Sequence, residues 1–119
     1  KNIPDVILQR LDSKVDDLKL TPVQKEKYNE LRASLKTHFS EAKEDRKKFK
    51  EVVRSEMAKD TPDVAGLTET MKKKVGDVSV IMQNDLDLFA AFYGSLDSTQ
   101  KQKVVTEIRE KMAGYGPWR

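Results

Sequence analysis

A single histidine and a nearby group of carboxylates are the residues whose types could perform metal or acid–base chemistry. His38 stands three residues before Glu41, and this spacing would place two metal ligands on one face of a helix. Glu41, Glu44 and Asp45 could together supply a general acid and base. They are interleaved with four cations: Lys43, Arg46, Lys47 and Lys48. Because helical neighbours of opposite charge pair on the surface, the segment favours paired charges over a catalytic site, and we expect no bound metal.

Composition narrows the possible function classes further. Cysteine is absent, which excludes disulfides, thiolate metal sites and thiol catalysis. The sequence has no glycine-rich phosphate loop and no nucleophile motif, so we expect neither an enzyme nor a cofactor. Its 23 basic and 20 acidic residues give a net charge of +3, too balanced for a dedicated nucleic-acid binder. No apolar run reaches the roughly 18 residues needed to cross a bilayer, so we expect no membrane insertion.

The spacing of apolar residues predicts an all-helical fold in a single domain that covers residues 1–119. The first helix is expected from about Pro4 to Leu18, with its apolar residues on one stripe. The second runs from Val23 to Lys59 without glycine or proline, which predicts roughly 38 residues and about 57 Å of continuous helix. Such a helix is longer than a compact domain of this size.

A long helical hairpin and a fourth helix complete the predicted fold. Thr61-Pro62 should begin the third helix, and Gly94 should end it. The turn before this helix is short, so the second and third helices must run antiparallel. A fourth helix should reach Gly114, and residues from about 114 to 119 should form a flexible tail.

The second predicted helix carries three distinct faces. At about 100° per residue, seven cations fall within roughly 40° of one line, namely Lys25, Arg32, Lys36, Lys43, Lys47, Lys50 and Arg54. Acidic residues cluster about 100° to one side, namely Glu26, Glu30, Glu41, Glu44 and Glu51. A thin apolar seam lies on the other side, with Phe39 and Met57 at its border with the cations and Arg46 within it. Lysine stems that shield an apolar seam explain the same layout in many helices.

The third predicted helix has the strongest apolar pattern in the sequence. Its main line, in steps of three and four residues, consists of Leu67, Met71, Val75, Val78, Met82, Leu86, Phe89 and Tyr93. A second line, about 100° around the helix, consists of Ile81, Leu88 and Phe92. Together the two lines are too wide for one partner helix, so additional helices or a second subunit must pack there.

A short motif occurs twice, and each copy precedes a predicted helix. The first copy is Leu20-Thr21-x-x-Gln24 and the second is Leu96-Asp97-x-x-Gln100; each continues as Gln-Lys-x-Lys. Threonine or aspartate at the N-cap accepts a backbone hydrogen bond from three residues on, and the glutamine there can reach back to the cap. Each copy is therefore expected to start a helix with a capping box.

The paired motif, the long hairpin and the turn at Asp60 to Asp63 resemble the Spy/CpxP family of bacterial periplasmic proteins with LTxxQ motifs. The resemblance extends from about Ile7 to Met112. The second copy departs from the family pattern by having Asp97 in place of threonine, although aspartate accepts the same backbone bonds. The resemblance implies a thin, curved, all-helical subunit that forms an antiparallel homodimer shaped like a cradle. It also implies a periplasmic, ATP-independent chaperone that acts on its concave side.

The resemblance and the charge pattern together give a candidate site. We expect unfolded or partly folded client proteins to bind along the basic and apolar surface of the second helix, at Arg32, Lys36, Phe39, Lys43, Arg46, Lys47, Lys50, Arg54 and Met57. One alternative is an adaptor that binds the periplasmic domain of an envelope-stress sensor kinase, as some members of the family are thought to do. A second alternative is a metal-responsive sensor that uses His38, although the histidine-rich segments of metal-binding relatives are absent.

Overall fold

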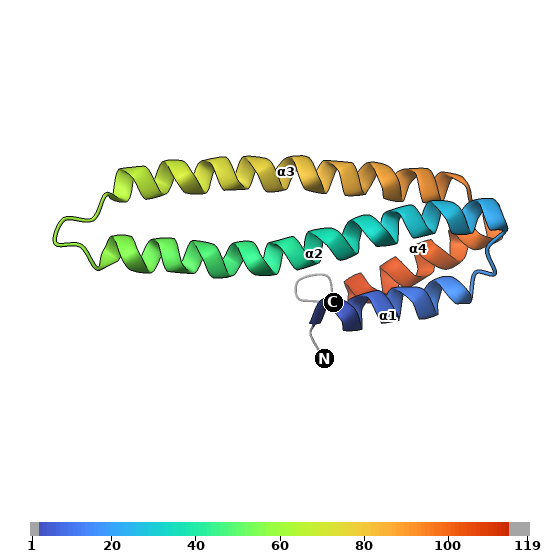
Figure 1. Cartoon of the computed structure of the whole chain (residues 1–119). Helices are drawn as coiled ribbons and strands as arrows, with labels where there is room; N and C mark the ends of the chain where they lie inside the picture. The colour runs from blue at the N-terminus through green and yellow to red at the C-terminus, as the bar shows by residue number, and fades with distance from the viewer. Residues whose placement is uncertain (1–2, 115–119) are drawn as a thin grey trace.

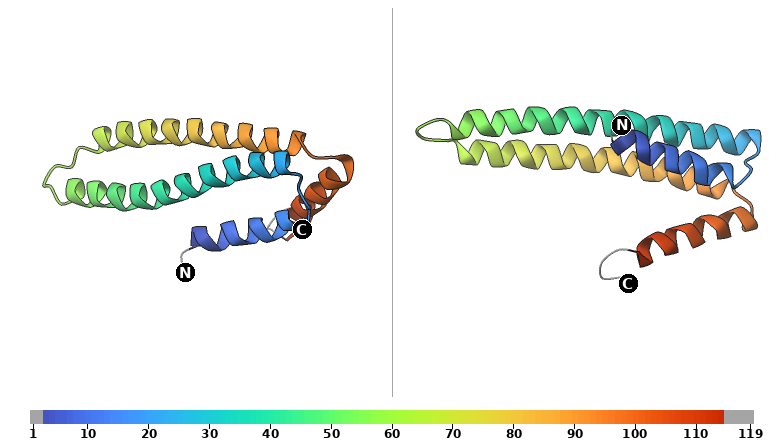
Figure 2. Two further views of the ribbon diagram at one scale, coloured as in Figure 1. Left: turned by 45° about the vertical axis from the view of Figure 1, so that its right-hand side comes forward. Right: turned by 90° about the horizontal axis from the view of Figure 1, so that it is seen from below.

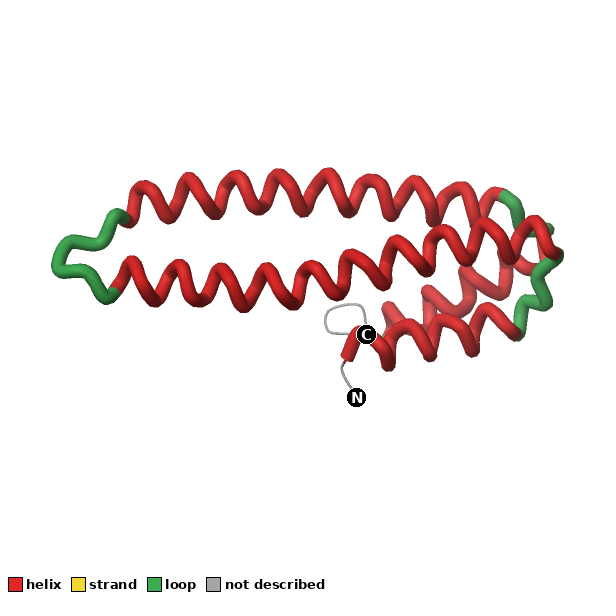
Figure 3. Tube along the Cα trace, in the orientation of Figure 1, coloured by secondary structure: helices red, strands yellow, loops and turns green. Residues whose placement is uncertain are grey.

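The computed structural model describes residues 3–114, and the predicted tail at 115–119 lies outside the described residues. Its four helices are α1 (Ile3–Asp16), α2 (Pro22–Met57), α3 (Val64–Gly94) and α4 (Ser98–Ala113), joined by short loops (Figures 1 and 3). This confirms the predicted all-α class, the four helices and the antiparallel pairing of α2 with α3. None of these helices is both long enough and apolar enough to span a bilayer.

The start of α3 differs from its prediction. Thr61-Pro62 belongs to the loop, and the helix begins at Val64 after Asp63 as N-cap. The Asp63 carboxylate accepts the Gly66 backbone N–H at 3.0 Å, and its own backbone N–H is bound by Glu56. A Cβ at residue 66 would collide with that carboxylate, so any other residue there would require the Asp63 side chain to move. Aspartate thus begins the helix two residues beyond the position that the proline suggested, because it can accept the free N–H groups of the first turn.

The end of α1 also comes earlier than predicted. The helix stops at Asp16, and Lys19 adopts the left-handed backbone conformation with φ = 54°. This turn frees Leu18 from the helix and directs it into the interior, where 8% of its surface remains exposed. The left-handed residue therefore redirects the chain into α2 without a glycine.

The molecule is an elongated rod with a thicker base. Its extents are 61 × 33 × 27 Å, and its radius of gyration is 18.8 Å, compared with about 13.5 Å for a compact chain of this length. The hairpin of α2 and α3 forms the rod, and α1 and α4 fold back along its base on one side (Figures 1 and 2). A shape this thin leaves much of each long helix in solvent.

The main buried cluster lies at the base. It consists of Leu18, Tyr28, Leu31, Phe92 and Leu96, and half-buried neighbours such as Val104 pack around it. Leu8 of α1 is also buried, with 2% of its surface exposed. The Tyr28 and Phe92 rings lie 5.6 Å apart at a tilt of 52°, a favourable arrangement for two aromatic rings. Hydrophobic stabilisation is therefore concentrated where all four helices meet.

Polar contacts link α2 to α3 beyond the core. The Asp85 carboxylate accepts a hydrogen bond from the Ser34 hydroxyl at 2.6 Å and contacts His38 Nδ1 at 2.8 Å. Further along, Lys74 Nζ lies 2.5 Å from the Asp45 carboxylate. The Asp85 contacts lie in the base half of the hairpin and the Lys74–Asp45 contact lies in its outer half.

The face of α3 that meets α2 is the second, shorter apolar line. Phe92 is buried and Ile81 and Leu88 are half-buried there, in line with Asp85. The main line is exposed over most of its length: Val75 keeps 69% of its surface in solvent and Leu86 keeps 64%. Only its last two members, Phe89 and Tyr93, pack against the base cluster. The strongest apolar pattern in the sequence thus has no partner within the described chain.

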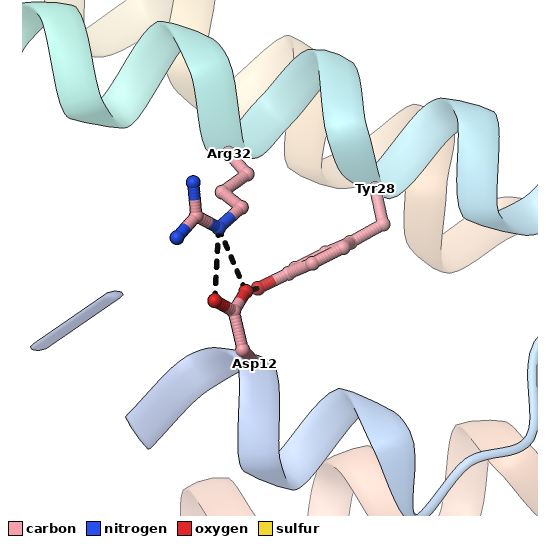
Figure 4. A network of polar contacts seen from close by, with 3 residues as sticks. All are labelled: Asp12, Tyr28 and Arg32. Atoms are coloured by element: carbon pink, nitrogen blue, oxygen red, sulfur yellow. Dashed lines mark hydrogen bonds and ion pairs between the residues drawn. The ribbon is translucent and has the colours of Figure 1, made fainter. Parts of the chain in front are cut away.

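A three-residue network attaches α1 to α2. Arg32 Nε donates to both oxygens of the Asp12 carboxylate, at 2.8 and 3.0 Å, and the Tyr28 hydroxyl donates to the same group at 2.6 Å (Figure 4). The hydrogen bond from Arg32 lowers the pKa of Asp12 below its ordinary value of 3.8. Burial, together with the bond to Asp12, raises the pKa of Tyr28. Both shifts favour a charged Asp12 and a neutral, donating tyrosine.

We predict that Asp12→Asn weakens the packing of α1 in a pH-dependent way. Because Asp12 and Arg32 each keep about a third of their side-chain surface exposed, solvent screening limits the loss to about 0.5–1 kcal/mol at pH 7. The folded-state pKa of Asp12 is lowered, so this stabilisation is present above the ordinary value of 3.8 and is lost as the pH falls through the folded-state value. Urea unfolding at several pH values should show the gap between wild type and variant closing below about pH 3.8. A gap that stays constant down to pH 2 would contradict this role.

Candidate functional site

Both copies of the repeated motif form capping boxes. Thr21 Oγ1 accepts the Gln24 backbone N–H at 3.3 Å, and Gln24 Oε1 accepts the Thr21 N–H at 3.0 Å. Asp97 and Gln100 repeat the arrangement at 2.8 and 2.9 Å. The aspartate in the second copy therefore performs the capping that threonine performs in the first. Leu20 is half-buried and Leu96 is buried, and both pack at the base cluster.

The two motif glutamines also bind each other. Gln24 Nε2 donates to Gln100 Oε1 at 2.9 Å, and Gln100 Nε2 donates to Gln24 Oε1 at 3.1 Å. The second N–H of Gln24 is donated to the Ser95 carbonyl at 2.9 Å, and that of Gln100 to the Leu18 carbonyl at 3.1 Å. Each glutamine keeps only 7% of its surface exposed. We call this arrangement the glutamine pair.

Every hydrogen-bonding group of the glutamine pair is used. A primary amide offers two N–H donors and two acceptor positions, and here all four are occupied on each side chain. The pair thus joins the start of each helix to the segment before the other: Gln24 of α2 binds Ser95, which precedes α4, and Gln100 of α4 binds Leu18, which precedes α2. Sequence reasoning predicted the caps but missed the pair. The available signal was the repetition itself, because a capping glutamine that is buried has donors left over and needs a second polar partner.

The cations of α2 fall into two groups. Arg32 is bound by Asp12, and Arg54 Nη1 lies 2.8 Å from Glu51. Between them, four lysines on the same line of α2 are exposed and have no ion-pair partner within residues 3–114, namely Lys36, Lys43, Lys47 and Lys50. We call these four lysines the basic row. Arg46 and Met57 are exposed beside the basic row, and Phe39 is half-buried.

The basic row lies beside an exposed apolar stripe of α3, which consists of Met71, Val75, Val78, Met82 and Leu86. The contacts of Ser34 and His38 with Asp85 fix which faces of α2 and α3 meet. The contact line of α2 is its buried and half-buried line, which includes Leu31, Leu35 and Phe49, and that of α3 includes Ile81, Asp85 and Leu88. At about 100° per residue, the basic row lies roughly 100° to 150° farther around α2 than its contact line, and the stripe lies roughly 60° to 120° farther around α3 than its own. Because two right-handed helices run antiparallel here, both rotations lead to the same side of the hairpin.

The positions of α1 and α4 agree with this assignment. α1 contacts α2 at Arg32, next to the basic row, and the last members of the α3 line, Phe89 and Tyr93, pack against the base cluster. Both short helices therefore cover the base of the side that carries the basic row and the apolar stripe. The outer part of this side is open, and we call it the open face.

Ser34 and His38 of α2 and Asp85 of α3 form a polar network between the two helices. The Ser34 hydroxyl donates a hydrogen bond to the Asp85 carboxylate, which also contacts His38 Nδ1, and that ring nitrogen lies 3.4 Å from Ser34 Oγ. The His38 ring is directed to Asp85 on α3, whereas Glu41 is exposed. Among residues 3–114, no three His, Asp or Glu side chains are grouped to hold a metal ion.

We predict that the glutamine pair contributes more than helix capping. Gln24→Ala removes one cap and leaves donors or acceptors of Gln100, Ser95 and Thr21 unpaired, so it should reduce the free energy of unfolding by about 2–4 kcal/mol. Because Gln100→Ala removes the same mutual bonds, the double variant should lose clearly less than the sum of the two single variants. Urea denaturation of all four proteins measures this coupling. Strict additivity would show that the two motifs act independently.

The sequence profile of the LTXXQ motif family matches residues 7–107 of the chain. No curated protein and no solved structure matched the chain. The matched region includes both copies of the motif and the whole hairpin between them. The chain belongs to the LTXXQ motif family, also called the Spy/CpxP family.

Proposed function

We propose that this protein is an ATP-independent chaperone that binds unfolded or partly folded proteins on the open face and suppresses their aggregation. The observation that carries the proposal is the row of unpaired lysines on α2 beside the exposed apolar stripe of α3. Chaperones of this kind and stress adaptors both occur in the LTXXQ family, and neither group is enzymatic. We further propose that the protein acts in the periplasm, where the family is generally found.

Capture and release follow from the two kinds of side chain on the open face. The lysines attract acidic segments over several ångströms and speed the first encounter. The nearby Phe39, Met57 and α3 stripe then hold apolar client residues weakly, and long flexible side chains adapt to many sequences. A client that folds buries its own apolar residues and loses affinity for this surface, so release requires no chemical step.

The apolar stripe of α3 supports the proposal of a homodimer. Five exposed aliphatic or methionine side chains in one line form a continuous apolar surface, and surfaces of this kind often mark contacts with other proteins. Two copies stacked fully face to face would bring their lysine rows together, which is electrostatically unfavourable. Antiparallel contact of stripe with stripe about a two-fold axis buries the apolar side chains and leaves both basic rows free for clients.

We predict that reversing the basic row impairs the chaperone. The triple variant Lys43→Glu, Lys47→Glu, Lys50→Glu should capture a denatured acidic test protein about ten-fold more slowly and with less salt dependence, because the steering charge is inverted. Its helicity should be unchanged, since these side chains contact no other described residue. Light scattering during dilution of the test protein from denaturant, together with stopped-flow capture rates, measures both effects.

The matched control makes three lysine-to-glutamate changes outside the open face, at Lys48, Lys103 and Lys111, which like the test lysines are exposed and have no ion pair within residues 3–114. It has the same net charge as the test variant and should behave like wild type. Equal loss in both variants, or no loss in either, would contradict the assignment of the basic row.

An adaptor for a sensor kinase would give a different pattern: tight binding to one sensor domain and no suppression of aggregation by the wild type.

We predict that Val75→Lys separates subunit stability from dimer stability. Val75 belongs to the stripe and keeps 69% of its surface in solvent, so the helicity of the dilute protein should stay unchanged. The dimer should weaken by about ten-fold or more, which corresponds to about 1.4 kcal/mol. Sedimentation equilibrium compares it with Val80→Lys, which makes the same change at an exposed valine on another face of α3. An unchanged dimer, or a wild type that stays monomeric at all concentrations, would refute the interface.

A further inference from the structure

A groove lies between the end of α3 and the outer face of α4. It has a volume of about 390 Å³ and is lined by Tyr93 of α3 and by Lys101, Gln102, Val105, Thr106 and Arg109 of α4. α4 folds back from the end of α3 at this place (Figures 1 and 2). The groove is separate from the basic row, which lies on the outer part of α2.

Two cations of the groove have no carboxylate partner within residues 3–114. Lys101 Nζ lies 5.6 Å above the centre of the Tyr93 ring, and Arg109 has no ion pair or hydrogen bond with another described residue. Around α4, Lys101, Val105 and Arg109 follow one another in steps of about 40°, and Glu107 and Glu110 lie at least about 100° outside this arc. Glu107 binds Lys14 of α1 instead. The groove is therefore positively charged and has no neutralising acid in its own wall.

The groove also offers an apolar floor. The Tyr93 ring stacks on Phe89, with centroids 6.2 Å apart, and Val105 lies opposite on α4. Phe89 and Tyr93 continue the line of the exposed α3 stripe toward the base. A chain that lies along the stripe would therefore reach the groove without a change of direction.

We propose that this groove binds an acidic peptide segment, with an apolar side chain against Tyr93 and Val105 and neighbouring carboxylates on Lys101 and Arg109. Charge complementarity identifies the ligand class, since two unpaired cations over an aromatic floor suit an anionic chain with apolar residues. This proposal rests on the proposed chaperone function in one respect: the acidic segment is part of an unfolded client. The groove is then a second contact for the same client, and two linked contacts bind more tightly than either alone.

The test uses the full chain and a short labelled peptide of alternating leucine and aspartate. Fluorescence anisotropy measures its affinity, and backbone amide NMR shifts locate it. We expect shifts at Tyr93, Lys101, Val105 and Arg109. The variant Lys101→Glu, Arg109→Glu should weaken binding by about five-fold or more. The same peptide with asparagine in place of aspartate should bind the wild type no more tightly than the aspartate peptide binds the double variant.

A matched control separates the groove from net charge. Lys103→Glu, Lys111→Glu makes the same charge change on the other side of α4, and its affinity should stay within about two-fold of wild type. NMR shifts confined to the basic row, or equal weakening in both double variants, would overturn the groove. If the peptide binds the groove but wild type does not suppress aggregation, the groove stands and the chaperone function falls. If aggregation suppression depends on the basic row and no shift occurs at the groove, the chaperone function stands and the groove falls.

Discussion

Mutual hydrogen bonding between Gln24 and Gln100, 76 residues apart, is the interaction on which the rest of this structure depends. It joins the first turns of α2 and α4 and also binds the carbonyls of Leu18 and Ser95, so one buried amide pair sets the directions of the chain at both junctions. The apolar cluster of Leu18, Tyr28, Leu31, Phe92 and Leu96 surrounds the same point. A fully satisfied polar pair inside a small core specifies a unique arrangement, because any other register would leave buried donors unpaired.

With the base held in this way, the hairpin needs little apolar packing of its own. Ser34 and His38 with Asp85 join its base half, Lys74 with Asp45 joins its outer half, and its helices keep long exposed sides. α2 carries lysines on one exposed side and glutamates on the other, so the hairpin presents opposite charges on its two sides. A rod of this kind has a large surface for its mass, which suits an extended and adaptable binding site better than an enclosed one.

Cations of the same type perform different tasks according to their neighbours. Arg32 holds α1 in place through Asp12, and Lys14 holds α4 through Glu107, so these side chains are part of the fold. Lys36, Lys43, Lys47 and Lys50 have no such partner within the described chain and remain available to an external anion. Lys101 and Arg109 have the same availability at the other end of the apolar line. The proposed binding surfaces are therefore defined by where intramolecular carboxylates are missing.

The sequence by itself determined the four helices, the hairpin and both caps, because these depend on local spacing and on residues three or four apart. It misplaced the start of α3, since Pro62 and Asp63 both signal a helix start and only the geometry of the turn selects Asp63. Only the tertiary structure decided which apolar line of α3 meets α2, because Ile81, Leu88 and Phe92 compete with a longer line for the same neighbour. The partners of Asp85 on α2 favour the shorter line. The glutamine pair was likewise beyond local reasoning, because its two members come together only when the hairpin has closed.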